Sequence, residues 1–135
     1  MSRDSHTAFG WTSIALGIGM GLVLGLWSFG GPLEAPYGLE DYASLPRRLI
    51  RLSHIAFVAL GALNVLFAVS MPETTGSARR RGGALLLFGS AFLPPLLAVS
   101  AFVPSAAPAC ALPAVSAGAG AALIAADAWQ RRFGR

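Results

Sequence analysis

The sequence predicts an all-α integral membrane protein, folded as a four-helix bundle with both termini on the cytoplasmic side. Only 12% of its 135 residues are charged and 55% are hydrophobic, and the mean hydropathy is +0.63. A soluble domain carries about a quarter charged residues, roughly twice this share. The hydrophobic residues also gather in four long runs, and a helix of about 20 apolar residues crosses the ~30 Å hydrocarbon core of a bilayer.

Each of the four runs is predicted to form one span, and together they make a single transmembrane domain over residues 1–135. The spans cover approximately residues 9–29, 49–71, 84–103 and 112–129. The first run has no charge and is longer than the roughly 7–15 apolar residues of a signal peptide, so we expect it to be retained. The fourth run is the shortest and consists largely of Ala and Gly, which leaves a re-entrant segment as its alternative.

The distribution of arginine predicts the orientation. All ten basic residues are Arg, which is typical of a GC-rich bacterial genome. With four spans, most of them lie on the side of the two termini: Arg3, Arg79, Arg80, Arg81, Arg131, Arg132 and Arg135. Because cytoplasmic loops are enriched in positive charge, we expect a bacterial inner-membrane protein with both termini in the cytoplasm. The expected partner of this charge is the lipid bilayer, with Arg79–Arg81 as an anchor on anionic lipid, and not nucleic acid.

Small residues recur every four positions in two of the spans, and we expect them to be helix-packing sites. The first span carries Ser13, Gly17, Gly21 and Gly25, and the fourth carries Ala114, Gly118, Ala122 and Ala126. Small residues at this spacing let helix backbones approach closely in a membrane. The pattern leaves open whether these faces pack within the chain or against a partner in a hetero- or homo-oligomer.

Pro94 and Pro95 lie at the middle of the third span and remove two backbone donors. The carbonyls of Ser90 and Ala91 then need another partner, because hydrocarbon supplies none. Asn64 of the second span is expected at the same depth. We therefore predict that the Asn64 amide donates a hydrogen bond into this kink.

Arg47, Arg51 and His54 form a stripe at the beginning of the second span, at positions i, i+4 and i+7. Ionisable residues in a span are candidates for function. Three interpretations stay open. His54 is a neutral side chain bonded to a serine or a backbone carbonyl, with Arg51 extending to the interface. Alternatively, His54 is an axial ligand of haem b, or the stripe contacts a quinone or an anionic lipid headgroup.

A haem with two histidine ligands would need a second subunit, because His6 is the only other histidine and precedes the first span on the opposite side. Ser28, Ser100 and Ser116 are expected at the depth of His54. Asp127 and Arg131 are expected to form an i,i+4 ion pair.

The sequence contains no catalytic dyad, metal-ligand cluster or phosphate-binding loop, and its lone cysteine cannot form an internal disulfide. No catalytic or metal residue and no cofactor are therefore predicted. The expected role is a non-catalytic accessory or assembly subunit of a larger membrane complex. The alternatives are a haem- or quinone-contacting subunit of an electron-transfer complex that uses His54, and a small oligomeric channel or carrier.

Overall fold

A computed structural model of the chain, which describes residues 2–28, 30–70 and 76–134, contains four long helices and one short one. The long helices are α1 (Arg3–Gly25), α2 (Leu45–Val69), α3 (Ser77–Phe102) and α4 (Ala111–Phe133), and the 3-10 helix η1 (Pro104–Cys110) precedes α4. All four long helices are long and apolar enough to cross a membrane. The predicted all-α four-helix fold is confirmed, and it is the architecture of a small multi-pass membrane protein.

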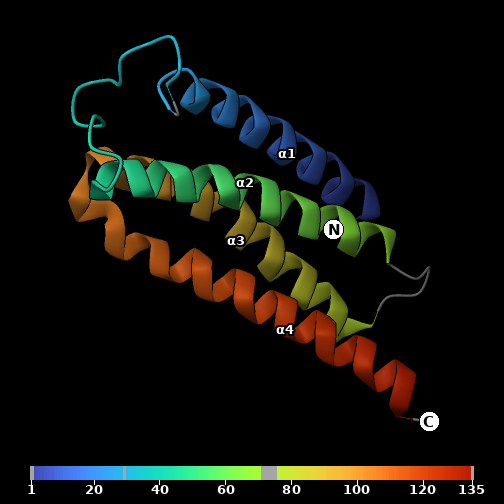
Figure 1. Cartoon of the computed structure of the whole chain (residues 1–135). Coiled ribbons are helices and arrows are strands. Elements are labelled where there is room, and N and C mark those ends of the chain that lie inside the picture. Colours follow the sequence, from blue (N-terminus) through green and yellow to red (C-terminus); the bar gives the residue numbers. More distant parts are fainter. Residues whose placement is uncertain (1, 29, 71–75, 135) are drawn as a thin grey trace.

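The four helices lie side by side in chain order and run alternately up and down (Figure 1). α1 packs on α2, α2 on α3, and α3 on α4. α1 and α4 therefore form the two edges of an open layer. Both chain termini lie at one end of the bundle (the termini end), and the 26–44 segment and η1 lie at the other (the loop end) (Figure 1).

The helices do not coincide with the apolar runs. α1 begins before the first run because Ser2 caps it, accepting a hydrogen bond from the Ser5 backbone N–H at 3.2 Å, with Asp4 in the first turn. α1 ends at Gly25, and the chain turns back so that Leu33 N donates to Leu26 O at 2.9 Å. α4 is one continuous helix of 23 residues.

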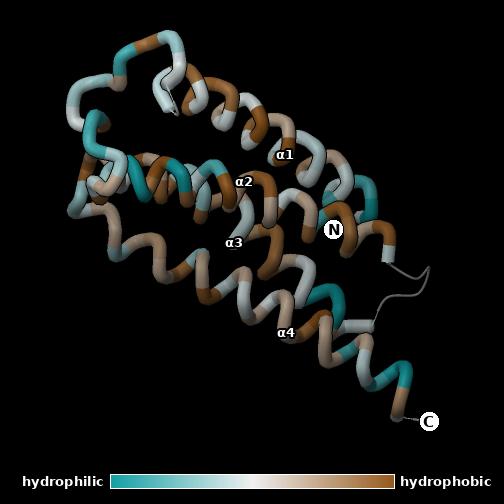
Figure 2. The backbone as a smooth tube through the Cα atoms, viewed as in Figure 1, coloured by the Kyte–Doolittle hydropathy of each residue, from teal (hydrophilic) through white to brown (hydrophobic). Residues whose placement is uncertain are grey.

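Most large apolar side chains on the helices point outward. Leu22 is 71% exposed, Leu66 63% and Val115 69%. Figure 2 shows hydrophilic residues near the helix ends and in the 26–44 segment, whereas hydrophobic residues colour the middle of the helices. This distribution suits helices whose outer faces contact lipid, since a water-exposed surface rarely carries such a continuous apolar belt.

Glycine permits close contact at the helix interfaces. A Cβ added to Gly61 of α2 would lie 2.8 Å from Gly10 O of α1, and one added to Gly89 of α3 would lie 2.5 Å from Pro113 O of α4. Any larger residue would push these backbones apart. The α1–α2 and α3–α4 pairs are therefore held by close backbone packing, which is a main source of helix association in membranes.

Candidate functional site

The small-residue stripe of α1 is used mainly within the chain. Ser13 Oγ donates to Phe57 O of α2 at 2.8 Å. A Cβ on Gly17 would lie 2.6 Å from Val58 Cγ2, and one on Gly21 would lie 2.5 Å from His54 Cε1. A Cβ added to Gly25, the last of the four, would meet nothing within 4 Å. Three of the four predicted packing residues thus face α2.

The corresponding stripe of α4 faces away from the rest of the chain. α4 packs on α3 through a different face, whose buried residues are Pro113, Ser116, Ala117 and Gly120. All four residues of the predicted stripe are exposed: Ala114, Gly118, Ala122 and Ala126. A Cβ added to Gly118 would meet nothing within 4 Å. α4 therefore carries two small-residue faces, one against α3 and one open.

His54 is fixed by a backbone carbonyl of the neighbouring helix. Its Nδ1 lies 2.7 Å from Gly17 O. A carbonyl oxygen only accepts hydrogen bonds, so Nδ1 is the donor in this contact and Nε2 is the ring nitrogen that takes no part in it. The ring lies against Gly21, where a Cβ would leave it no room. The orientation of the imidazole thus depends on the glycines of α1.

A small pocket of about 160 Å³ lies between α1 and α2 at the loop end. It is lined by Gly21, Leu24, Gly25, Ser28, Tyr42, Arg51 and His54. The Arg51 guanidinium lies over the Tyr42 ring, 4.0 Å from its centroid. The structure therefore brings together Arg51, His54 and Ser28. Ser100 and Ser116 do not line this pocket; they donate to Leu96 O and Leu85 O of α3, at 2.7 and 3.0 Å.

Arg47 has a different position from the other two residues of its stripe. It is 5% exposed and lies outside the pocket lining. Its guanidinium donates to the carbonyls of Leu39, Glu40 and Trp27 at 2.9, 3.1 and 3.2 Å, and to Ser28 Oγ at 3.0 Å. Arg47 thus ties the 26–44 segment to α2. This role of Arg47 could not be predicted from the sequence, because most of the hydrogen-bond partners of Arg47 are backbone atoms.

A buried polar network crosses three helices nearer the termini end. His6 Nδ1 of α1 lies 2.8 Å from Asn64 Oδ1 of α2. The Asn64 amide donates to Leu60 O and to Ser90 Oγ of α3, both at 2.9 Å, and Ser90 Oγ donates to Leu86 O at 2.7 Å. His6 is 1% exposed, and Asn64 and Ser90 are fully buried. Sequence reasoning missed His6, which it placed outside the first span.

Asn64 does reach α3, but at the Ser90 hydroxyl, and the carbonyls of Ser90 and Ala91 are not among its hydrogen-bond partners. α3 continues as a helix through Pro94 and Pro95. The interhelical hydrogen bond at the proline pair comes from Ser53, whose hydroxyl donates to Pro94 O at 2.7 Å. Ser53 is fully buried. A hydrogen bond from Ser53, a residue that hydropathy does not single out, thus supports the proline pair.

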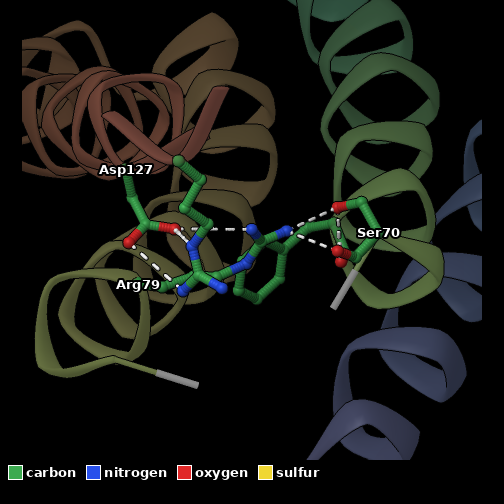
Figure 3. Close-up of polar contacts among 5 residues, drawn as sticks. Ser70, Arg79 and Asp127 are labelled. Atoms are coloured by element: carbon green, nitrogen blue, oxygen red, sulfur yellow. Dashed lines mark hydrogen bonds and ion pairs between the residues drawn. The ribbon is translucent and has the colours of Figure 1, made fainter. Parts of the chain in front are cut away.

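Arg79 joins three helices at the termini end (Figure 3). Its guanidinium donates to Ser70 O and Ser70 Oγ, at the residue that caps the end of α2, at 2.7 and 2.8 Å, and lies 3.5 Å from Asp127 Oδ2 of α4. Arg131 approaches the same carboxylate oxygen to 2.9 Å, which confirms the i,i+4 pair. Arg79 was expected as a lipid anchor, but it is 5% exposed and inside the bundle. Arg80 and Arg81 are exposed.

In the part of the chain that the structure describes, no group of three His, Cys, Asp or Glu side chains is placed to hold a metal ion. Comparison of the chain with protein-family models, curated protein sequences and solved structures found no match. The function is therefore inferred from the geometry of the chain itself.

Proposed function

We propose that the protein is a non-catalytic accessory or assembly subunit of a larger complex in the bacterial inner membrane, with both termini in the cytoplasm. The open stripe of α4 carries this proposal. Its four exposed small residues follow one another at four-residue intervals, and its Gly118 faces empty space. In lipid, such a face allows a second helix to approach closely and gain van der Waals contact.

The buried polar side chains of the bundle support a structural role. Each one named here has a hydrogen-bond partner within the chain: His6, Ser13, Ser53, Asn64, Ser90, Ser100 and Ser116. The bonds from Ser100 to Leu96 O and from Ser90 to Leu86 O lie within α3, and the others join one helix to another. Polar groups committed to helix contacts favour a scaffold over a transport path, which needs polar groups that can exchange partners.

The charge distribution supports the proposed orientation. The described arginines at the termini end, Arg3, Arg79, Arg80, Arg81, Arg131 and Arg132, outnumber those at the loop end, Arg47, Arg48 and Arg51. The side richer in arginine is usually cytoplasmic. Labelling of single cysteines at each end in intact cells tests this orientation.

A blocking substitution on α4 tests the proposed role. Gly118→Ile adds a branched side chain to the open stripe, at a position where an added Cβ meets no other described residue within 4 Å. Gly19→Ile is the matched control, because a Cβ added to Gly19 of α1 also meets nothing within 4 Å. We expect the wild-type chain of 13.9 kDa to migrate in a much larger complex in native gels of membranes solubilised in mild detergent. Gly118→Ile should release it, and Gly19→Ile should not.

Three results would contradict the accessory role. They are a free wild-type chain, an equal effect of both variants, and a complex that contains only copies of this chain. The last result would instead favour an oligomeric channel or carrier. Mass spectrometry of the excised gel band distinguishes a homo-oligomer from a complex with other subunits.

The geometry of His54 favours a second candidate function, contact with a haem or a quinone. Histidines that ligate a metal usually donate their other ring N–H to a carbonyl or carboxylate, and His54 does so to Gly17 O. The adjoining pocket of about 160 Å³ is smaller than the roughly 300–1,000 Å³ of typical small-molecule sites, so a partner subunit would have to complete it. A Soret band or bound quinone in the native complex, lost in His54→Ala, would support this candidate.

A further inference from the structure

A larger groove lies on the other side of the bundle, between α2 and α4. Both helices pack on α3. The groove has a volume of about 610 Å³, within the range of ligand sites. Its apolar lining consists of Leu63, Leu66 and Phe67 of α2, Leu86 of α3, and Ala121, Ile124, Ala125 and Ala128 of α4. The alanines of α4 are too short to fill the space between the two helices.

The polar residues of the groove lie together at the termini end. They are Ser70, Arg79 and Arg131. From this end the lining extends about seven residues along α2, from Ser70 to Leu63, and about seven along α4, from Ala128 to Ala121. At the helical rise this is ~10 Å, roughly the first third of the hydrocarbon core. The groove thus has a charged mouth and an apolar floor that leads inward.

The charged mouth carries more positive than negative charge. Asp127 is shared between Arg79, at 3.5 Å, and Arg131, at 2.9 Å, so one carboxylate faces two guanidinium groups. Arg79 Nε is buried, and among the described residues it has no hydrogen-bond partner. An uncompensated charge in a buried position is costly unless an anion approaches it.

Neighbouring residues add to the excess. Arg80, Arg81 and Arg132 are exposed on the adjacent turns of α3 and α4. The sequence also places Glu73 in the connection between α2 and α3, outside the described residues, and the balance stays positive when its charge is included. The mouth is therefore complementary to a negatively charged group.

We propose that this groove binds one anionic phospholipid of the leaflet at the termini end. Its phosphate lies at Arg131, which is 42% exposed in its side chain, with the charge of Arg79 beneath it. One acyl chain follows the apolar lining past Leu66, Leu86 and Ile124. One anionic lipid contacts the charged mouth with its headgroup and the apolar floor with its acyl chain. A zwitterionic lipid would gain little from the excess positive charge of the mouth.

Native mass spectrometry of the full chain in detergent tests the proposal. The protein is titrated with phosphatidylglycerol or with phosphatidylcholine of the same acyl chains. We expect one phosphatidylglycerol to remain bound, with an affinity at least about fivefold above that of phosphatidylcholine, the ratio for one net charge near a membrane. Arg131→Gln should strongly reduce the preference, because Asp127 then neutralises Arg79 and the remaining arginines lie outside the groove lining. Arg132→Gln makes the same charge change outside the groove and should retain it.

A second pair of variants locates the acyl chain. Ala125→Phe fills the groove and should reduce binding of both lipids at least fivefold, whereas Ala119→Phe, on an exposed position outside the lining, should not. Circular dichroism confirms that each variant is helical. Equal affinity for both lipids, equal loss in Arg131→Gln and Arg132→Gln, or normal binding by Ala125→Phe would overturn the proposal. A lipid-free dimer would show that a second copy occupies the groove.

Discussion

Removing the Asn64 side chain tests whether the network of His6, Asn64 and Ser90 holds α1, α2 and α3 together. Asn64→Leu keeps a similar volume at a fully buried position but deletes the contacts to His6 and Ser90, at 2.8 and 2.9 Å. Each interhelical hydrogen bond in a membrane contributes about 0.6 kcal/mol, with a maximum near 1.7. A buried polar group left unpaired, here His6 Nδ1, costs about 1–3 kcal/mol more. We expect the free energy of unfolding to fall by about 2–4 kcal/mol.

A double-mutant cycle isolates the contact between His6 and Asn64. His6→Leu, Asn64→Leu and the double variant are unfolded from mixed micelles with increasing dodecyl sulfate, and helix content is followed by circular dichroism. The double variant should be less destabilised than the sum of the singles by about 0.5–2 kcal/mol, because each single change already breaks the same hydrogen bond. Ser100→Ala is the control, since Ser100 donates to Leu96 O of its own helix. Additivity within about 0.3 kcal/mol would refute a direct contact.

Three further substitutions probe other contacts. Arg47→Gln removes the donors that hold three backbone carbonyls of the 26–44 segment, so amide hydrogen exchange in this segment should accelerate about tenfold or more. Unchanged exchange would contradict the proposed role of Arg47 in fixing the segment to α2. Gly89→Leu should destabilise the purified protein by more than about 2 kcal/mol because its Cβ meets the α4 backbone, whereas Gly118→Leu in open space should change stability by less than about 0.5. Ser53→Ala leaves Pro94 O without its interhelical donor and should lower the free energy of unfolding by about 1 kcal/mol in the same assay. A change near zero would show that this carbonyl needs no interhelical partner.

The four helices could be predicted because hydropathy over about 20 residues is a strong and local signal. Their ends could not. Ser2 and Asp4 extend α1 by more than a turn before the apolar run, since helix capping depends on single polar residues and not on hydropathy. At the other end α1 stops at Gly25, although apolar residues continue beyond it. The reversal of the chain there is a tertiary feature that hydropathy does not record.

The candidate site was predictable only where it is local. Arg51 and His54 are three residues apart on one helix, and both line the same pocket. His6 and Asn64 are 58 residues apart, and their contact exists only because the early start of α1 carries His6 into the bundle. For α4, Ala and Gly occur on nearly every face, so spacing alone could not show which face packs on α3. Residues of contrasting size, as on α1 and α2, would have distinguished the face of α4 that packs on α3 from its open face.

The serial order of the helices has a consequence for how the protein is made. Because the main contacts join helices that are adjacent in sequence, α1 and α2 can pair before the ribosome has translated α3, and α3 and α4 can pair as the last helix leaves the translocon. The bonds from Asn64 to Ser90 and from Ser53 to Pro94 then join the two hairpins. No helix has to wait for a partner that is distant in sequence, so the chain can complete its own fold during synthesis and leave the outer face of α4 open.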